Sequence, residues 1–163
     1  VSSFLVETDW SGVNKFQSFE QNGISRFGGV YFAVPLFDTS LGANFNSFLR
    51  VNQLTTVPLF DTSSGIRFSS FLSSNQLTTF PANFFDKTPG TRFDRLCDSN
   101  NIDQTGIDNI IISINKARKD GFQTEPEKIL ELDNAGAAPS AAGEAEIDEL
   151  RAAGWTVAVA GGY

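Results

Sequence analysis

Two stretches of this chain repeat one another almost residue for residue. Val-Pro-Leu-Phe-Asp-Thr-Ser occupies residues 34–40 and returns 23 residues later at residues 57–63. The agreement continues past these seven residues, because the Phe-x-x-Phe-Leu of residues 45–49 returns at residues 68–72. A fixed period in the low twenties is typical of a stacked solenoid, in which each copy contacts its neighbours. The period therefore constrains the fold more than any single residue does.

Each repeat is predicted to form one short parallel strand and one short helix. The Leu-x-x-[Val/Phe]-Pro part has the apolar spacing of leucine-rich repeats, which use it as a strand. The Phe-x-x-Phe-Leu part places apolar residues at i, i+3 and i+4, on one face of a helix, and the Asp-Thr-Ser before it offers oxygens to cap that helix. The strand positions are Tyr31/Val34/Leu36, Leu54/Val57/Leu59 and Leu77/Phe80/Ala82, and the helix positions are Phe45/Phe48/Leu49, Phe68/Phe71/Leu72 and Phe93/Leu96/Cys97.

The chain is expected to be one continuous α/β domain with two parts. Residues 1–104 form the repeat solenoid, in which residues 1–30 are a degenerate first repeat, since terminal repeats are usually atypical. Residues 105–163 form an acidic α/β cap that extends the sheet and covers its open edge. The cap is predicted to contain a helix at 105–119, a strand at 128–133, a loop at 134–139, the N-cap Ser140, a helix at 141–153 that stops at Gly154, and a strand at 155–159.

Composition narrows the function. The chain has 16 Phe, of which 15 precede residue 96, and this number predicts a core of packed aromatic layers. The first 96 residues carry seven acidic and seven basic side chains, so the net charge of −7 arises entirely from residues 97–163. An acidic chain without a Lys/Arg cluster is a poor partner for nucleic acid or anionic membrane, and the absence of a long apolar run argues against membrane insertion.

Catalytic and metal chemistry are not expected. With no His and a single Cys, the chain lacks the usual base for a Ser or Cys nucleophile and the usual zinc ligands, so Cys97 is predicted to be a buried hydrophobe. Asp38, Asp61 and Asp86 recur once per repeat, and we expect each to cap its own turn or helix. A calcium ladder is the alternative for these carboxylates, but one acid per coil is sparse for six to eight oxygen ligands. No catalytic residue, metal site or cofactor is predicted.

Two further sets of residues recur. Asn52, Asn75 and Asn100 predict a ladder of side-chain amides that satisfies backbone groups of adjoining coils. The strand face of a solenoid presents a regular grid for binding, which would be rich in hydroxyl groups here and suited to protein or glycan contacts, although β-propensity alone also explains the threonines. The candidate binding residues are Tyr31, Thr55, Thr56, Thr78, Thr79 and Gln104.

The repeat resembles a known family. Phe-Asp-Thr-Ser-Ser-Gly at 60–65, Phe-x-x-Phe-Leu at 68–72 and Leu-Thr-Thr-Phe-Pro at 77–81 resemble the repeat of BspA-like bacterial surface leucine-rich-repeat proteins. With Arg-Ala-Ala-Gly-Trp-Thr-Val-Ala-Val at 151–159, the chain is also similar to a variant found in phage and marine-virus structural proteins. It departs from the family where Met and Cys are common, since Phe71, Ser74 and Asn75 stand there, and this departure weakens the link to host-binding bacterial proteins.

The resemblance implies a non-enzymatic structural or adhesion module. The first expectation is a virion surface component, such as a capsid decoration, fibre or tail-associated protein. Its partners would be other virion or surface proteins, a host receptor or a glycan, and it would form a homo-oligomer or lattice. The alternative is an extracellular adhesion or filament protein of a bacterial cell surface, and a third class is a glycan-active enzyme on a repeat scaffold.

Overall fold

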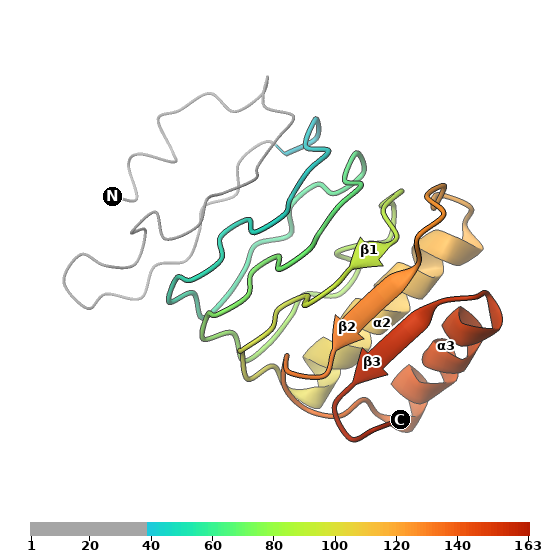
Figure 1. The fold of residues 1–163 in the computed structure, drawn as a ribbon. Helices are drawn as coiled ribbons and strands as arrows, with labels where there is room; N and C mark the ends of the chain where they lie inside the picture. The colour runs from blue at the N-terminus through green and yellow to red at the C-terminus, as the bar shows by residue number, and fades with distance from the viewer. Residues whose placement is uncertain (1–38) are drawn as a thin grey trace.

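A computed structural model of the chain describes residues 39–163, in which a row of coils runs into a small parallel sheet with two helices behind it (Figure 1). The sheet has the order β1-β2-β3, and both pairs are parallel. Predictions for residues 1–30, Tyr31, Val34, Leu36 and Asp38 lie outside the described residues. The elements are β1 (Arg92–Phe93), α2 (Gln104–Lys119), β2 (Ile129–Leu132), α3 (Ala141–Ala152) and β3 (Thr156–Val159).

The coils between residues 39 and 103 lie side by side and repeat one backbone pairing (Figure 1). Asn44 forms a parallel bridge with Arg67, and Arg67 forms the same bridge with Arg92. The bonds alternate with these bridges, since Phe45 N donates to the Arg67 carbonyl at 2.9 Å and Phe68 N donates to the Arg92 carbonyl at 3.1 Å. Because Arg92 lies in β1, the pairing continues from the coils into the three-stranded sheet.

Aromatic rings stack beneath this row of pairings. Phe45, Phe68 and Phe93 are fully buried, and their ring centroids follow one another at 5.2 Å in nearly parallel planes. Trp155 continues the column at 6.1 Å from Phe93, just before β3 begins. A second pair, Phe48 and Phe71, stacks at 5.8 Å. The prediction that phenylalanine forms the core is confirmed for the described residues, and offset ring pairs of this kind add stability beyond their buried area.

The predicted short helix in each repeat is wrong. Residues 45–49, 68–72 and 93–97 form turns in which every second residue has a positive φ, for example 55° at Ser70 and 57° at Leu72. Their N–H groups bond the neighbouring coil instead of the residue four positions back, as Ser70 N does to the Asp94 carbonyl at 2.9 Å. The i, i+3, i+4 apolar spacing holds in this compact turn as well, which is why the periodicity alone misled.

The predicted strands are also misplaced. Residues 54–59 and 77–82 contain no strand, although Asp103 N donates to the Thr78 carbonyl at 2.8 Å and Gln76 N to the Leu54 carbonyl at 2.9 Å. The parallel pairing lies instead at Asn44, Arg67 and Arg92, where the motif was interpreted as the start of a helix. Pro58 and Pro81 follow the Leu-x-x-[Val/Phe] segment and cannot donate a ladder bond, which limits strand formation there.

The amide ladder predicted for the asparagines is confirmed for Asn75 and Asn100. Asn75 Oδ1 accepts from Leu54 N at 3.1 Å, and Asn100 Oδ1 accepts from Leu77 N at 3.0 Å. The amide nitrogen of each also donates to carbonyl groups in its own coil and in the preceding coil. These bonds satisfy backbone groups at a corner where no regular element can do so.

The C-terminal elements match their predictions to within about two residues. Asp103 Oδ1 accepts from Gly106 N at 2.7 Å and caps α2, and Ser140 caps α3 as expected. Gly154 ends the segment after α3 with a φ of 86°, a conformation that glycine adopts at little cost. Strands β2 and β3 extend the sheet from β1, as predicted.

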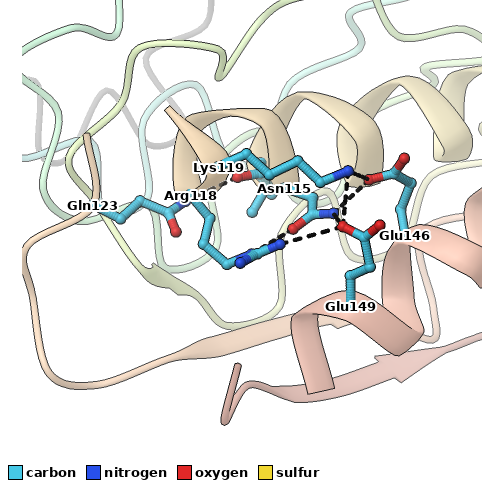
Figure 2. A network of polar contacts seen from close by, with 7 residues as sticks. Asn115, Arg118, Lys119, Gln123, Glu146 and Glu149 are labelled. Carbon is cyan, nitrogen blue, oxygen red and sulfur yellow. Dashed lines mark hydrogen bonds and ion pairs between the residues drawn. The ribbon is translucent and has the colours of Figure 1, made fainter. Parts of the chain in front are cut away.

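A buried asparagine joins the two helices (Figure 2). Asn115 of α2 is fully buried, and its amide nitrogen donates to Glu149 Oε2 at 2.9 Å and to Glu146 of α3. Arg118 Nε donates to Asn115 Oδ1 at 2.6 Å, and Lys119 Nζ pairs with both glutamates at 3.0 and 2.8 Å. The network fixes the helix pair behind the sheet and leaves the opposite face of the sheet open for contacts.

Candidate binding surface

The outward face of the paired coils carries polar side chains on either side of the buried phenylalanines. Arg67 and Arg92 precede Phe68 and Phe93, and because side chains alternate across a strand they point away from the core. Both arginines are exposed. The coil-to-coil register therefore places equivalent side chains of successive repeats next to one another on one surface.

A continuous chain of hydrogen bonds, which we name the polar row, crosses this surface. Asn46 Oδ1 accepts from Ser69 N at 3.0 Å, and Ser69 Oγ donates to Asp94 Oδ1 at 2.6 Å. Arg92 Nε donates to the same oxygen of Asp94 at 2.7 Å, and Arg92 Nη1 donates to Glu127 Oε2 at 3.0 Å. The row thus links three coils to the loop that precedes β2. It consists of Asn46, Ser69, Asp94, Arg92 and Glu127.

The electrostatics of the polar row keep its charges in place. Partial burial would raise the pKa of Asp94, but the hydrogen bond from Ser69 and the Arg92 guanidinium outweigh it and hold that pKa below its usual value. The same contact with Asp94 raises the pKa of Arg92. Both groups are therefore charged at neutral pH, and the pair is a fixed dipole on the surface rather than a proton donor or acceptor.

Arg67 differs from Arg92, because it makes no ion pair among residues 39–163. It borders two adjoining hollows, of about 260 and 110 Å³, that lie between the coils and the loop before β2. Glu125 lines both hollows. A guanidinium carries five donors in a fixed fork and suits carboxylate groups, so Arg67 is the cation on this face best placed to bind an acidic side chain of a partner.

The predicted threonine grid is brought together only in part. Thr56, Thr78, Thr79 and Gln104 are exposed, whereas Thr55 is half-buried. The threonines follow the asparagine corner and do not lie on the paired strands, so they form a strip beside the polar row rather than the strand face that was predicted. Gln104 is the first residue of α2, and its amide donates to the Ala138 carbonyl at 3.3 Å. Tyr31 lies outside the described residues.

Sequence reasoning missed the charged members of this surface. The signal was present, since Arg-Phe occurs at residues 67–68 and again 25 residues later at 92–93. It was overlooked because the Phe-x-x-Phe-Leu segment was interpreted as a helix, in which Arg67 and Arg92 would have been unrelated capping residues. In the observed register they are neighbours.

The recurring acids and the cysteine have structural roles in the described part of the chain. Asp61 Oδ1 accepts from Ser63 N at 2.9 Å and so caps its own turn, as predicted, although no helix follows. Cys97 is fully buried, and burial raises the pKa of its thiol, as expected for a small hydrophobe. Residues 39–163 contain no group of three or more acidic or cysteine side chains arranged to hold a metal ion.

Comparisons of the chain with protein-family models, with curated proteins and with solved structures gave no match. Within the described residues, neither helix is long and apolar enough to cross a membrane. The function is therefore argued from the chain's own surface.

Proposed function

We propose that this chain is a non-enzymatic structural or adhesion module whose repeats stack as a leucine-rich-repeat-like solenoid. The stacking proposal is supported by contacts that recur along the chain: the parallel bridges of Asn44, Arg67 and Arg92, the ring column beneath them, and the asparagine bonds at the corner. Repeat arrays of this kind use their regular outer surface for contacts with large partners.

The observation that carries the proposal is the polar row. Its side chains are already held by one another, with successive bonds of 3.0, 2.6, 2.7 and 3.0 Å from Asn46 to Glu127. A surface whose side chains are fixed before binding loses less conformational entropy when a partner docks. The exposed Arg67 beside the row adds a cation for an acidic group of the partner. These features favour protein contacts on this face.

The setting we propose is the surface of a virion, in agreement with the family resemblance of the repeat and of residues 151–159. There the chain would serve as a capsid decoration, a fibre or a tail-associated protein. Its partners would be other virion proteins or a host receptor, and many copies would be arranged side by side.

Gold labelling of an epitope-tagged chain, expressed from its native genomic context, tests this proposal. Regularly spaced label on purified particles is the expected result. Label confined to bacterial envelopes would overturn the virion setting in favour of a cell-surface protein, and label in neither fraction would overturn both. The double variant Arg67→Glu/Arg92→Glu should abolish particle labelling, while the control Asp133→Lys, an exposed charge outside the polar row, should preserve it. Equal labelling of all three proteins would exclude this face as the contact surface.

A further inference from the structure

A cleft of about 350 Å³ lies between two successive copies of the same loop. Residues 59–63 form one wall and residues 83–87 form the other, so that Asp61 and its counterpart Asp86 both line the space. The polar row lies elsewhere and shares no residue with it. A volume of this size is within the range of small-ligand pockets. The lining residues are Leu59, Phe60, Asp61, Thr62, Ser63, Asn83, Phe84, Asp86 and Lys87.

The mouth of the cleft holds polar groups that the protein itself does not use. Asp61 binds Ser63 N through Oδ1, and its second oxygen has no hydrogen-bond partner among the described residues. The side chains of Asn83 and Lys87 are exposed and likewise have no partner within residues 39–163. The cleft therefore offers a carboxylate acceptor, an amide that both donates and accepts, and an ammonium donor.

Asp86 gives a second reason to regard the cleft as a site. Its Oδ1 is buried and has no hydrogen-bond partner. Burial raises the pKa of this carboxyl, while the nearby Lys116 opposes the rise. An unpaired buried acceptor is unfavourable by about 1–3 kcal/mol, so it is rarely retained without a reason. A hydroxyl donor from a bound molecule would compensate part of that cost.

The chemistry of the lining selects the ligand. Two carboxyl groups and one ammonium group leave the cleft close to neutral, which disfavours strongly charged molecules. Leu59, whose side chain is 51% exposed, supplies an apolar wall beside these donors and acceptors. Closely spaced hydroxyl groups next to an apolar C–H surface are the features of a sugar ring. A neutral ring of this kind fits the volume as well as the polarity.

We propose that this cleft binds a neutral hexose-type sugar, alone or at the end of an oligosaccharide. In this arrangement Asp61 and Asp86 accept from sugar hydroxyls, Asn83 and Lys87 donate to them, and Leu59 packs against the ring. The proposal deepens the adhesion function and rests on it in one respect: a glycan-binding site gives the module a receptor chemistry separate from its protein-contact face.

Titration of the full isotope-labelled chain with methyl glycosides, followed by amide chemical shifts, tests the site. The probes are the methyl glycosides of glucose, galactose, mannose and N-acetylglucosamine. Saturable shifts confined to residues 59–63 and 83–87 are expected for at least one of them, with a dissociation constant on the order of 1 mM, because a single ring makes few contacts. Absence of saturable shifts with all four sugars would overturn the proposal.

Two variants sharpen the test. Asp61→Asn keeps the turn-capping oxygen but removes the charge, and Asn83→Gly removes the amide while tolerating the φ of 62° at this position. Each should weaken binding about five- to tenfold, as expected for one lost hydrogen bond. Asp133→Asn, an exposed carboxylate outside the cleft, is the matched control and should bind normally.

The unliganded spectra of the variants show whether the fold is intact, and a Lys87→Ala variant replaces any that unfolds. Binding that is the same in all folded variants would overturn the assignment. Sugar binding without particle labelling would overturn the virion setting alone, whereas particle labelling without sugar binding would overturn the cleft alone.

Discussion

Asn75 and Asn100, 25 residues apart, make the same contact with the coil that precedes each of them. Asn75 Oδ1 accepts from Leu54 N at 3.1 Å, and Asn100 Oδ1 accepts from Leu77 N at 3.0 Å. The amide nitrogen of each also donates at 2.7 Å to the carbonyl three residues earlier in its own coil. One side chain thus closes a corner and joins two coils, which fixes their spacing.

The substitution Asn75→Ala should therefore lower the free energy of unfolding by about 2–4 kcal/mol. It leaves a buried N–H and two buried carbonyls without their partner, and each such group is unfavourable by about 1–3 kcal/mol. Denaturant melts of the variant measure the loss. Gln76→Ala, at the exposed next position, should stay within about 0.5 kcal/mol of the parent. Equal effects of the two substitutions would contradict the ladder.

The aromatic core predicts a second loss. Phe71 is fully buried and contacts the rings of Phe48 and Phe68 at 5.8 and 5.7 Å, so Phe71→Ala should cost about 3–5 kcal/mol. Thermal or chemical melts check this value. Phe122→Ala is the matched control, because the Phe122 side chain is 42% exposed and its removal should cost much less. A loss below about 1 kcal/mol for Phe71→Ala would be inconsistent with a packed layer.

The sequence was most informative where one local signal had one structural solution. Ser140, Gly154 and the isoleucine spacing of α2 predicted the cap correctly, because capping and amphipathic helices follow local rules. The Phe-x-x-Phe-Leu segment was misinterpreted because its apolar spacing suits a helix and also a turn with alternating positive φ. What decided between them was the supply of hydrogen-bond partners in the next coil, which is a tertiary property.

The candidate surface could be predicted less well than the fold. Threonines were chosen for their hydroxyl groups, yet the polar row depends on which residues of adjoining coils face one another, such as Ser69 and Asp94. That register follows from a pairing at Arg67 and Arg92, about ten residues before the predicted strands. The cleft between residues 59–63 and 83–87 depends on the two-residue insertion in the later copy, whose conformation no repeat pattern specifies.

The carboxyl of Asp86 predicts a dependence of stability on pH. Its pKa in the folded protein is raised, mainly by burial, so the folded state binds the proton more readily than the unfolded state does. Asp86 therefore stabilises the fold least above its raised pKa, and this deficit disappears as pH falls below the ordinary value of 3.8. Asp86→Asn should raise stability at pH 7 by up to about 1 kcal/mol, since solvent screens much of the charge.

Melts of the Asp86→Asn variant and its parent from pH 3 to pH 8, on the order of one pH unit apart, check this sign. The difference should shrink toward acid pH. Asp133→Asn, an exposed carboxylate after β2, should show no such trend. A difference that grows on acidification would mean that Asp86 gains a favourable partner on folding, contrary to its unpaired Oδ1.

The interhelical network separates a buried amide from exposed charges (Figure 2). Asn115→Ala should cost about 1–3 kcal/mol, because the fully buried amide donates to both Glu146 and Glu149. Lys119→Ala should cost less than about 1 kcal/mol, since its ammonium is exposed and screened. Melts at low and high salt distinguish the two: only the Lys119 effect should fall with ionic strength. A salt-sensitive Asn115 effect would assign the network to charge rather than to the amide.

Gly136 marks the point where the cap closes against the last coil. It forms a parallel bridge with Ile102, and Ala137 N donates to the Ile102 carbonyl at 2.8 Å. A Cβ at Gly136 would lie 2.1 Å from that carbonyl oxygen, and backbone atoms held by hydrogen bonds cannot move aside cheaply. Gly136→Ala should therefore destabilise the protein by about 1–3 kcal/mol or more.

Gly121→Ala separates this steric effect from the general cost of replacing glycine. Gly121 has a φ of 77° and open space around its Cβ position, so alanine there meets only backbone strain of about 1 kcal/mol. Denaturant melts should rank Gly136→Ala as the more destabilising of the two. Hydrogen exchange at Ala137 should also accelerate in Gly136→Ala, since its amide loses the bond to Ile102. Unchanged protection at Ala137 would mean that the cap docks on the coil without this close approach.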